Sequence, residues 1–287
     1  MDVGIGLPNT VVGTTGSQLL DWSRRAERSG FSSLASIGAL SYPGYEELTA
    51  FAAAAAVTER IRFLTNVLIA PVRSTAGLAK QAATVDQISG GRLSLGLGPG
   101  WRPSDYVLSG RDFETRGAAF DRQLADLKRT WAGESLDPEA RSSSPAPVQN
   151  PIPILIGGTT KAAVRRVVEH GVGWTAGGMP PDAVAEFVKT VGDAWTAAGR
   201  EGSPKIVALV YFSLGDVEQR SREYLLDYYA PMGPEVSGMI ADGALRSAEA
   251  IKAALAAYEQ AGVGELILDP SVGDPDQVDA LADVVFG

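Results

Sequence analysis

Strand-like and helix-like segments alternate strictly along this chain, eight of each, and this alternation constrains the fold more than any other feature. The strand-like segments are 3–7, 33–37, 61–67, 93–98, 152–156, 173–176, 205–214 and 265–268. The helical patterns are 17–29, 45–58, 76–88, 116–131, 161–169, 181–198, 248–261 and 275–285. Such alternation favours a parallel sheet, and eight repeats predict an α/β protein, a (β/α)8 TIM barrel. Since no low-complexity hinge divides the 287 residues, we expect a single domain over 1–287.

The segment 78–101 shows one repeat in detail. A helical pattern ends at Gly90 and Gly91, which can adopt the positive φ of a helix end. Alternating leucines then indicate a strand, which leads into a Gly-Pro-Gly-Trp loop at 98–101. In a barrel of parallel strands this carboxyl end is where ligands bind. The turn before the strand lies at the opposite face, so Arg92 is expected to have a structural role.

Composition excludes several classes of function. The net charge of −9 disfavours binding to nucleic acid or to anionic membranes. The chain has no cysteine and one histidine, His170, so we expect no disulfide, no metal site and no Ser-His-Asp triad. It begins without a signal-peptide pattern, and its longest alanine-rich run, 50–57, is too short to cross a bilayer. These observations predict a cytoplasmic protein.

Two longer segments interrupt the alternation. The Pro- and Ser-rich segment 133–153 leads from the fourth helix to the fifth strand, so it is expected as an exposed loop on the amino-terminal face. The segment 216–246 follows the seventh strand and contains an amphipathic stretch, 217–229, and a Gly/Pro-broken stretch, 230–243. An insertion at the ligand face can cover the site as a lid.

Five motifs carry a resemblance to a known family. They are GIGLPN at 4–9, TNVLIAP at 65–71 with LAKQ at 78–81, SGGRLSLGLGPG at 89–100, PILIGG at 153–158, and GALRSAE at 243–249 with GVGELIL at 262–268. In this order and spacing the chain resembles the bacterial luciferase-like monooxygenases, a family of flavin- and deazaflavin-dependent oxidoreductases. The resemblance covers nearly the whole chain. It implies a flavin-type cofactor at the carboxyl face of the barrel.

A flavin-type cofactor needs amide donors for its phosphate and a smooth wall for its ring. Gly157, Gly158, Thr159 and Thr160 precede a helix, so free N–H groups and two hydroxyls are available for a phosphate. The same geometry is typical of a helix cap, and either threonine could serve that purpose alone.

The resemblance assigns further residues to the cofactor. It places Leu7, Thr65, Gly98, Gly100 and Trp101 beside it, with Gly177 as a second phosphate-side glycine. It also implies a cis peptide bond at Asn66-Val67 that forms the wall for the ring. Trp101 could instead pack under its loop.

The chain departs from the family at one position. Where relatives place a proton-exchanging residue after the second strand, this chain has Ala39. Trp101, Tyr106 and Tyr211 are therefore the pocket candidates for catalysis, and Tyr42 or Tyr45 could also supply a hydroxyl. Glu46 and Glu47 are expected to point apart and to favour a helix start.

The absent acid favours oxygen chemistry with reduced FMN on a small organic substrate over deazaflavin hydride transfer, because hydride transfer often needs a neighbouring proton donor. A deazaflavin enzyme and a non-catalytic flavin-binding protein remain the alternatives, and a barrel hydrolase is disfavoured. Since no second nucleotide domain is visible, reduced FMN is expected from a separate reductase. The alanine-rich segment 50–56 predicts a homodimer interface.

Overall fold

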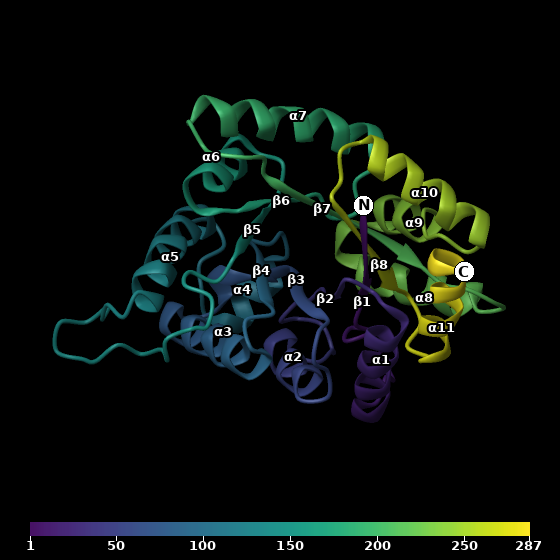
Figure 1. Ribbon diagram of the computed structural model, residues 1–287, viewed down its shortest axis with the longest axis horizontal. Coiled ribbons are helices and arrows are strands. Elements are labelled where there is room, and N and C mark those ends of the chain that lie inside the picture. The colour runs from purple at the N-terminus through teal and green to yellow at the C-terminus, as the bar shows by residue number, and fades with distance from the viewer.

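Eight parallel strands form a closed barrel in the computed structural model, which describes all of residues 1–287. Each strand pairs with its neighbours in sequence order, and β8 closes the barrel on β1 (Figure 1). The predicted TIM barrel is confirmed. The strands are β1 Asp2–Gly6, β2 Ser33–Ser36, β3 Arg62–Ile69, β4 Leu93–Gly98, β5 Ile154–Gly157, β6 Gly173–Thr175, β7 Lys205–Phe212 and β8 Glu265–Pro270.

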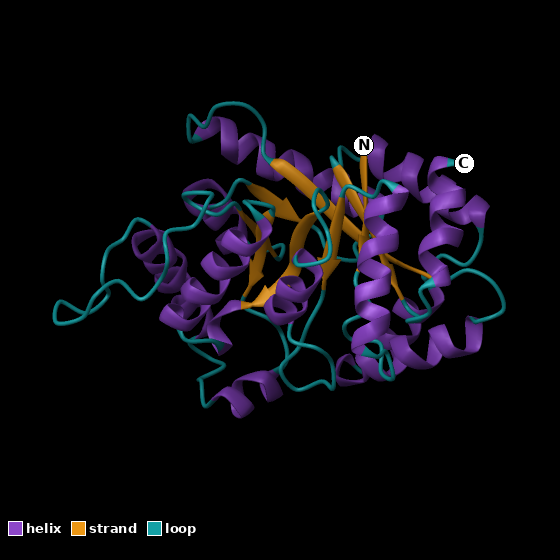
Figure 2. Cartoon of the chain, turned by 60° about the horizontal axis from the view of Figure 1, so that its bottom comes forward, coloured by secondary structure: helices purple, strands orange, loops and turns teal.

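Helices form the outer layer around the strands (Figure 2). They are α1 Gly16–Ser29, α2 Glu47–Ala55, α3 Thr75–Ser89, α4 Pro103–Ser109, α5 Arg116–Trp131, α6 Lys161–His170, α7 Pro181–Ala197, α8 Glu218–Tyr228, α9 Pro234–Asp242, α10 Ala248–Gln260 and α11 Asp276–Phe286. Two short 3-10 helices, Ala70–Val72 and Ala230–Met232, complete the set. No helix is long and apolar enough to span a membrane.

Helix ends are fixed by local caps. Ser74 caps the start of α3 by accepting a hydrogen bond from the backbone N–H of Gly77, and Gly90 ends the helix with a φ of 67°. Thr15 forms a capping box with Gln18 at the start of α1. The predicted glycine stop at Gly90 is confirmed, because a left-handed residue at this position carries no side chain that would clash.

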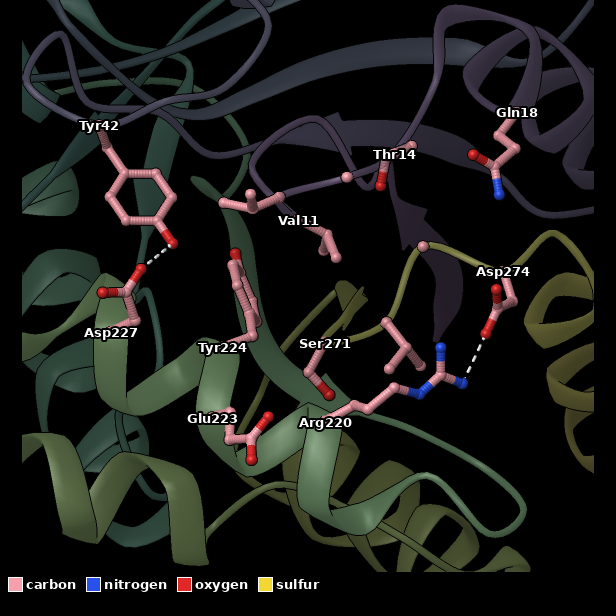
Figure 3. A pocket seen from close by; sticks show the side chains of 14 residues that line it. Val11, Thr14, Gln18, Tyr42, Arg220, Glu223, Tyr224, Asp227, Ser271 and Asp274 are labelled. Atoms are coloured by element: carbon pink, nitrogen blue, oxygen red, sulfur yellow. Dashed lines mark hydrogen bonds and ion pairs between the residues drawn. The ribbon is translucent and has the colours of Figure 1, made fainter.

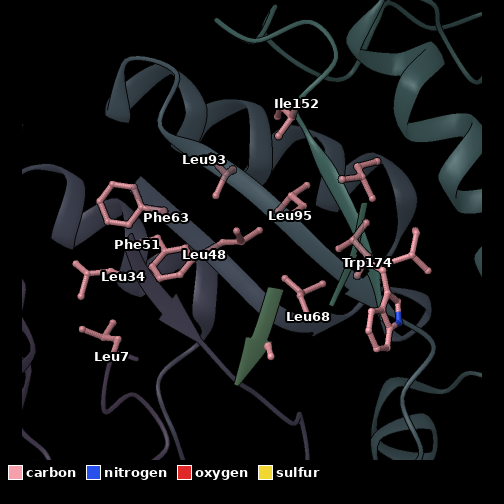
Figure 4. Packing of buried hydrophobic residues seen from close by; sticks show 14 of the residues in the cluster. Leu7, Leu34, Leu48, Phe51, Phe63, Leu68, Leu93, Leu95, Ile152 and Trp174 are labelled. Carbon is pink, nitrogen blue, oxygen red and sulfur yellow. The ribbon is translucent and has the colours of Figure 1, made fainter. Parts of the chain in front are cut away.

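The main core lies between the barrel and the helices. Aromatic and aliphatic side chains of β3 and β4 pack there against α2, with Phe51, Phe63 and Leu93 all fully buried (Figure 4). A second, smaller cluster fills the barrel interior beneath α8 and includes Leu64 and Ile267. The interior is therefore packed with side chains, as in other barrels of this size, and ligands are confined to its ends.

Arg92 joins β4 to the end of α2. Its guanidinium donates hydrogen bonds to the carbonyls of Ala55, Thr58, Ile61 and Ser89 and to the Thr58 hydroxyl, at 2.6 to 3.2 Å. It also lies over the ring of Phe63, 5.0 Å from the centroid. This network confirms the structural role expected for Arg92.

The first insertion takes the form expected from the sequence, and the second does so in part. Residues 133–153 form no helix or strand and project from the amino-terminal side as the loop at the far left of Figure 1. Helices α8 and α9 follow β7 and lie over its carboxyl end. The sequence did not predict α9 or the seven-residue α4. For α9 the reason is that its Pro and Gly residues are typical of a segment without regular structure.

Candidate functional site

The carboxyl ends of the strands surround a region that we call the mouth. It is defined by residues Gly6, Leu7, Asn66, Val67, Gly98, Gly157, Thr175, Tyr211, Ser213 and Asp269. Six of the residues predicted from the sequence to bind the cofactor or to act in catalysis lie there: Leu7, Asn66, Val67, Gly98, Gly157 and Tyr211. Helix α8 packs against this region, while Val67 stays partly exposed.

A bulge in β3 shapes one wall of the mouth. The Asn66-Val67 peptide bond is cis, as the family resemblance implied, and the pairing with β4 shifts between Thr65 and Leu68. Val67 is turned toward two glycines: a Cβ on Gly157 would lie 2.9 Å from a Val67 methyl, and one on Gly98 would lie 3.2 Å away. The glycines leave room for Val67 and create a smooth apolar surface.

The mouth also contains polar atoms without partners. Asn66 accepts a hydrogen bond from the Thr175 hydroxyl at 2.5 Å, but its amide nitrogen has no acceptor. The hydroxyl of Ser213 and one carboxyl oxygen of Asp269 are likewise buried and unpaired. An unpaired buried polar group costs about 1–3 kcal/mol. These atoms therefore fit a ligand that carries both hydrogen-bond donors and acceptors.

Three tyrosines of α8 and its end lie at the mouth. The Tyr224 hydroxyl bonds that of Thr10 at 2.6 Å, and the Tyr229 hydroxyl bonds that of Tyr211 at 2.7 Å. The Tyr228 ring lies 5.0 Å from that of Tyr229. Burial raises the pKa of Tyr229 to about 12 and that of Tyr211 well above its usual value. These hydroxyls are therefore protonated at neutral pH.

Arg102 fastens the loop after β4 to this lid. Arg102 is 4% exposed and forms no ion pair, and its guanidinium donates to the carbonyl of Tyr228. It lies 4.4 Å from the centroid of the Tyr228 ring and 4.8 Å from that of Trp101. A desolvated cation over aromatic rings stabilises the contact. Trp101 is 39% exposed, so it lies on the rim beside Arg102 rather than packing beneath its loop.

The other residues of this loop support it. Tyr106 is buried and donates its hydroxyl to the carbonyl of Pro99 at 2.5 Å. Gly100 has a φ of 68°, and a Cβ there would lie 2.8 Å from a carbon of Ile69. Thr65 donates to the carbonyl of Gly96 at 2.9 Å, which binds β3 to β4. The Tyr106 and Thr65 hydroxyls thus have partners within the protein.

The loop 157–160 has the geometry expected of a phosphate site and of a cap. Thr160 caps α6 by accepting from the backbone N–H of Ala163 at 3.2 Å. Gly158 has a φ of 99°, and its carbonyl accepts from the Trp174 indole at 2.8 Å. Thr159 is exposed. The capping interpretation is confirmed for Thr160, and phosphate binding stays a prediction. Gly177, with a φ of 60°, ends β6 nearby.

Ala39 lies beside the buried carboxylate of Glu47. Glu46 caps the start of α2 by accepting from two backbone N–H groups of its first turn, as expected of a residue that favours a helix start. Both Glu46 and Glu47 bind Arg73, at 2.6 and 2.7 Å, so the expectation that they point apart is wrong. Burial raises the pKa of Glu47, and the Arg73 guanidinium opposes that rise. These residues and Ala39 line two small cavities of about 120 and 100 Å³.

Two larger cavities flank the mouth. One of about 440 Å³ lies between the loops after β1 and β8 and helix α8, where Tyr42 donates to Asp227 and Arg220 pairs with Asp274 (Figure 3). The other, about 370 Å³, lies between α4 and α5 and is lined by Arg73, Arg111 and Arg122 among others. Neither cavity includes the loop 157–160.

Comparisons with known proteins give the family. Residues 1–284 match the model of the luciferase-like monooxygenases. The chain belongs to this family. This is the family that the sequence motifs implied.

Two relatives illustrate the sequence similarity, one uncharacterised and one a named monooxygenase. An uncharacterised protein of Mycobacterium tuberculosis is 36% identical over 165 residues, 55% of this chain and 57% of that protein. The chain thus matches little more than half the length of this relative. An FMNH2-dependent dimethylsulfone monooxygenase of Pseudomonas putida is 26% identical over 238 residues, 75% of this chain and 64% of that enzyme.

Solved structures share the fold over the whole chain. The monooxygenase RslO1 from Streptomyces bottropensis has a TM-score of 0.81 at 22% identity, with 100% of this chain and 99% of that chain covered. An F420-dependent secondary alcohol dehydrogenase has a TM-score of 0.78 at 15% identity, with 99% and 98% covered. The mouth fits a flavin-type cofactor: Val67, Gly98 and Gly157 form a smooth wall, and unpaired polar atoms lie beside it.

Proposed function

We propose that this protein is a monooxygenase that uses reduced FMN and oxygen to insert one oxygen atom into a small organic substrate. The observation that carries the proposal is the mouth itself, where the Val67 wall lies beside the unpaired amide nitrogen of Asn66. A flat ring with an apolar face and a polar edge satisfies both. The FMNH2-dependent relative from Pseudomonas putida supports FMN as that ring.

Each part of the site has a proposed task. Val67 and the glycines opposite it support the face of the ring, and Asn66 contacts its polar edge. The loop 157–160 holds the phosphate through Thr159 and the free N–H groups at the start of α6. Bound FMN, once reduced, supplies the two electrons that activate oxygen. The α8 tyrosines exclude water from the mouth during that chemistry.

The proposed enzyme depends on other proteins. A separate flavin reductase supplies the reduced FMN, as the FMNH2-dependent relative suggests, and both proteins act in the cytoplasm. We also propose that the whole chain acts as one domain in a homodimer. Ala53 and Ala56 of the α2 region are exposed, whereas Ala54 and Ala55 are buried against the barrel, so only the outer face of α2 is available for a partner.

A deazaflavin enzyme is the second candidate, and one observation favours it. Arg111 is exposed, forms no ion pair and lines the 370 Å³ cavity beside α4, where it could bind an anionic tail. Arg102 and Arg116 are less available, because Arg102 is buried against the lid and Arg116 stacks on Phe113 at 3.7 Å. The absence of an acid at Ala39 and the net charge of −9 favour FMN.

A cofactor titration separates these functions. The protein is titrated with FMN and with deazaflavin, and each reduced complex is then mixed with oxygen in the presence of candidate substrates. We expect FMN to bind and to be reoxidised with formation of an oxygenated product. Tight binding of deazaflavin without FMN affinity would favour hydride transfer. Bound flavin with no substrate-dependent reoxidation would favour a flavin-binding protein without turnover.

A further inference from the structure

Strand β8 carries two buried carboxyl groups four residues apart. Glu265 lies at its amino end and Asp269 near its carboxyl end, and each is only 1% exposed. Charged groups at such depth normally have a cation or several hydrogen-bond donors beside them. The two positions differ in this respect, and the difference indicates what Asp269 does.

Glu265 is fully compensated. Lys205 places its ammonium 2.8 Å from one carboxyl oxygen, and the hydroxyls of Ser32 and Ser33 donate to the other at 2.7 and 2.6 Å. Against the opposing effect of burial, these partners hold the pKa of Glu265 below its usual value. Glu265 is therefore an ionised group that closes the amino-terminal end of the barrel.

Asp269 has none of these partners. It forms no ion pair within 4 Å, and its Oδ1 has no hydrogen-bond donor. Its carboxyl lies directly over Gly6 in the neighbouring strand, where a Cβ would come within 1.9 Å of Oδ1. Only glycine fits at position 6. The chain thus keeps a space for this carboxyl while providing nothing to neutralise its charge.

The groups around Asp269 favour its neutral form. It pairs with Tyr211 across the sheet, and the phenols of Tyr224, Tyr228 and Tyr229 approach from the lid. Two charged groups act on Tyr228, and both are engaged elsewhere: Arg102 donates to the Tyr228 carbonyl, and Glu47 is paired with Arg73. Burial raises the pKa of Asp269 well above its usual value.

We propose that Asp269 is the proton donor of the mouth, the group that takes the place of the acid missing at Ala39. This inference rests on the proposed function. Insertion of one oxygen atom balances as substrate, oxygen, the reduced FMN anion and one proton giving oxygenated substrate, FMN and water. The carboxyl O–H of Asp269 breaks to supply that proton to the oxygen atom that leaves as water, and the carboxylate regains a proton from solvent.

The closing experiment starts with the protein alone. The infrared spectrum of the wild type near neutral pH is expected to contain the carbonyl-stretch band of a protonated carboxyl group. Asp269→Asn should remove this band, and Glu265→Gln, the matched change at the ionised carboxyl of the same strand, should leave it. A wild-type spectrum without the band, or a band that persists in Asp269→Asn, would overturn the proposal whatever cofactor binds.

Turnover gives the second measurement. Asp269→Asn keeps the shape of the side chain but has no acidic proton, so product formation is expected to fall about 100-fold or more. The wild type should lose activity as pH rises through the pKa of Asp269, and the variant should lack that limb. Turnover of Asp269→Asn within about threefold of the wild type would refute proton donation. If FMN does not bind but the infrared band is present, the cofactor assignment is refuted instead. Asp269→Asn must then cause the same loss of turnover with deazaflavin.

Discussion

Replacement of Thr159 by valine tests the proposed phosphate loop without disturbing the fold. Thr159 is exposed, so the free energy of unfolding should change by less than about 0.5 kcal/mol. A hydrogen bond to a charged phosphate contributes about 1.5–3 kcal/mol. Since each 1.4 kcal/mol is about a tenfold change, the Kd for FMN should rise roughly 10- to 100-fold.

Thr160 needs a separate variant. Its hydroxyl caps α6, so Thr160→Val should lower the free energy of unfolding by about 1 kcal/mol even without any ligand. Replacement of both threonines at once would mix this loss of the cap with any loss of phosphate binding. Thr159→Ser retains a hydroxyl at the tested position and serves as the matched control.

Riboflavin separates the phosphate from the ring. It carries the same ring as FMN without the phosphate, so Thr159→Val should leave the Kd for riboflavin unchanged while weakening FMN. Fluorescence titration measures both constants, and urea unfolding checks stability. Equal weakening of both ligands, or an FMN affinity within about threefold of the wild type, would refute phosphate binding by Thr159.

Three further predictions follow from the contacts described above. Arg92→Met removes five hydrogen bonds and should lower the free energy of unfolding, measured in urea, by about 3 kcal/mol. The FMN affinity of the folded protein should not change, and a loss of stability below about 1 kcal/mol would contradict the structural role of Arg92. Ala53→Arg should shift a wild-type dimer to monomer in sedimentation, and a monomeric wild type would end the dimer proposal; Ala54 is buried, so its replacement would test packing instead. Asp269→Asn should gain stability relative to the wild type as pH rises from about 4 to about 7. The reason is that Asp269 loses its proton above about pH 3.9 in the unfolded wild type but keeps it in the folded protein. Parallel pH profiles of unfolding in urea for the two proteins would show that Asp269 is ionised in the fold.

The barrel could be predicted from the sequence because its signals are local. Helix α5 was predicted with its observed bounds, and Gly90 ends α3 as its position indicated. The missed helices, α4 and α9, are short and begin at proline, so neither contains enough turns for a clear apolar period. Their stability depends on contacts such as Tyr106 with Pro99, which no local pattern specifies.

The site was predictable only where a family motif carried it. The cis bond at Asn66-Val67 and the loop 157–160 belong to such motifs. Arg102 was not placed against the lid, because its contact with Tyr228 joins segments 126 residues apart. Asp269 was missed because the predicted strand stopped at residue 268. Asp269 could have been found from its position, because an acidic residue at the carboxyl end of a barrel strand is typical of an active site.

Desolvation links the lid to the proposed acid. Burial raises the pKa of Asp269, and the pKa values of Tyr224, Tyr228 and Tyr229 are raised by their own burial and by a charge on Asp269. Contact with water would lower the pKa of Asp269 toward its ordinary value, because a solvated carboxylate is stable. The proposed acid therefore requires that the mouth shield Asp269 from solvent, the same condition that protects the ring chemistry from water.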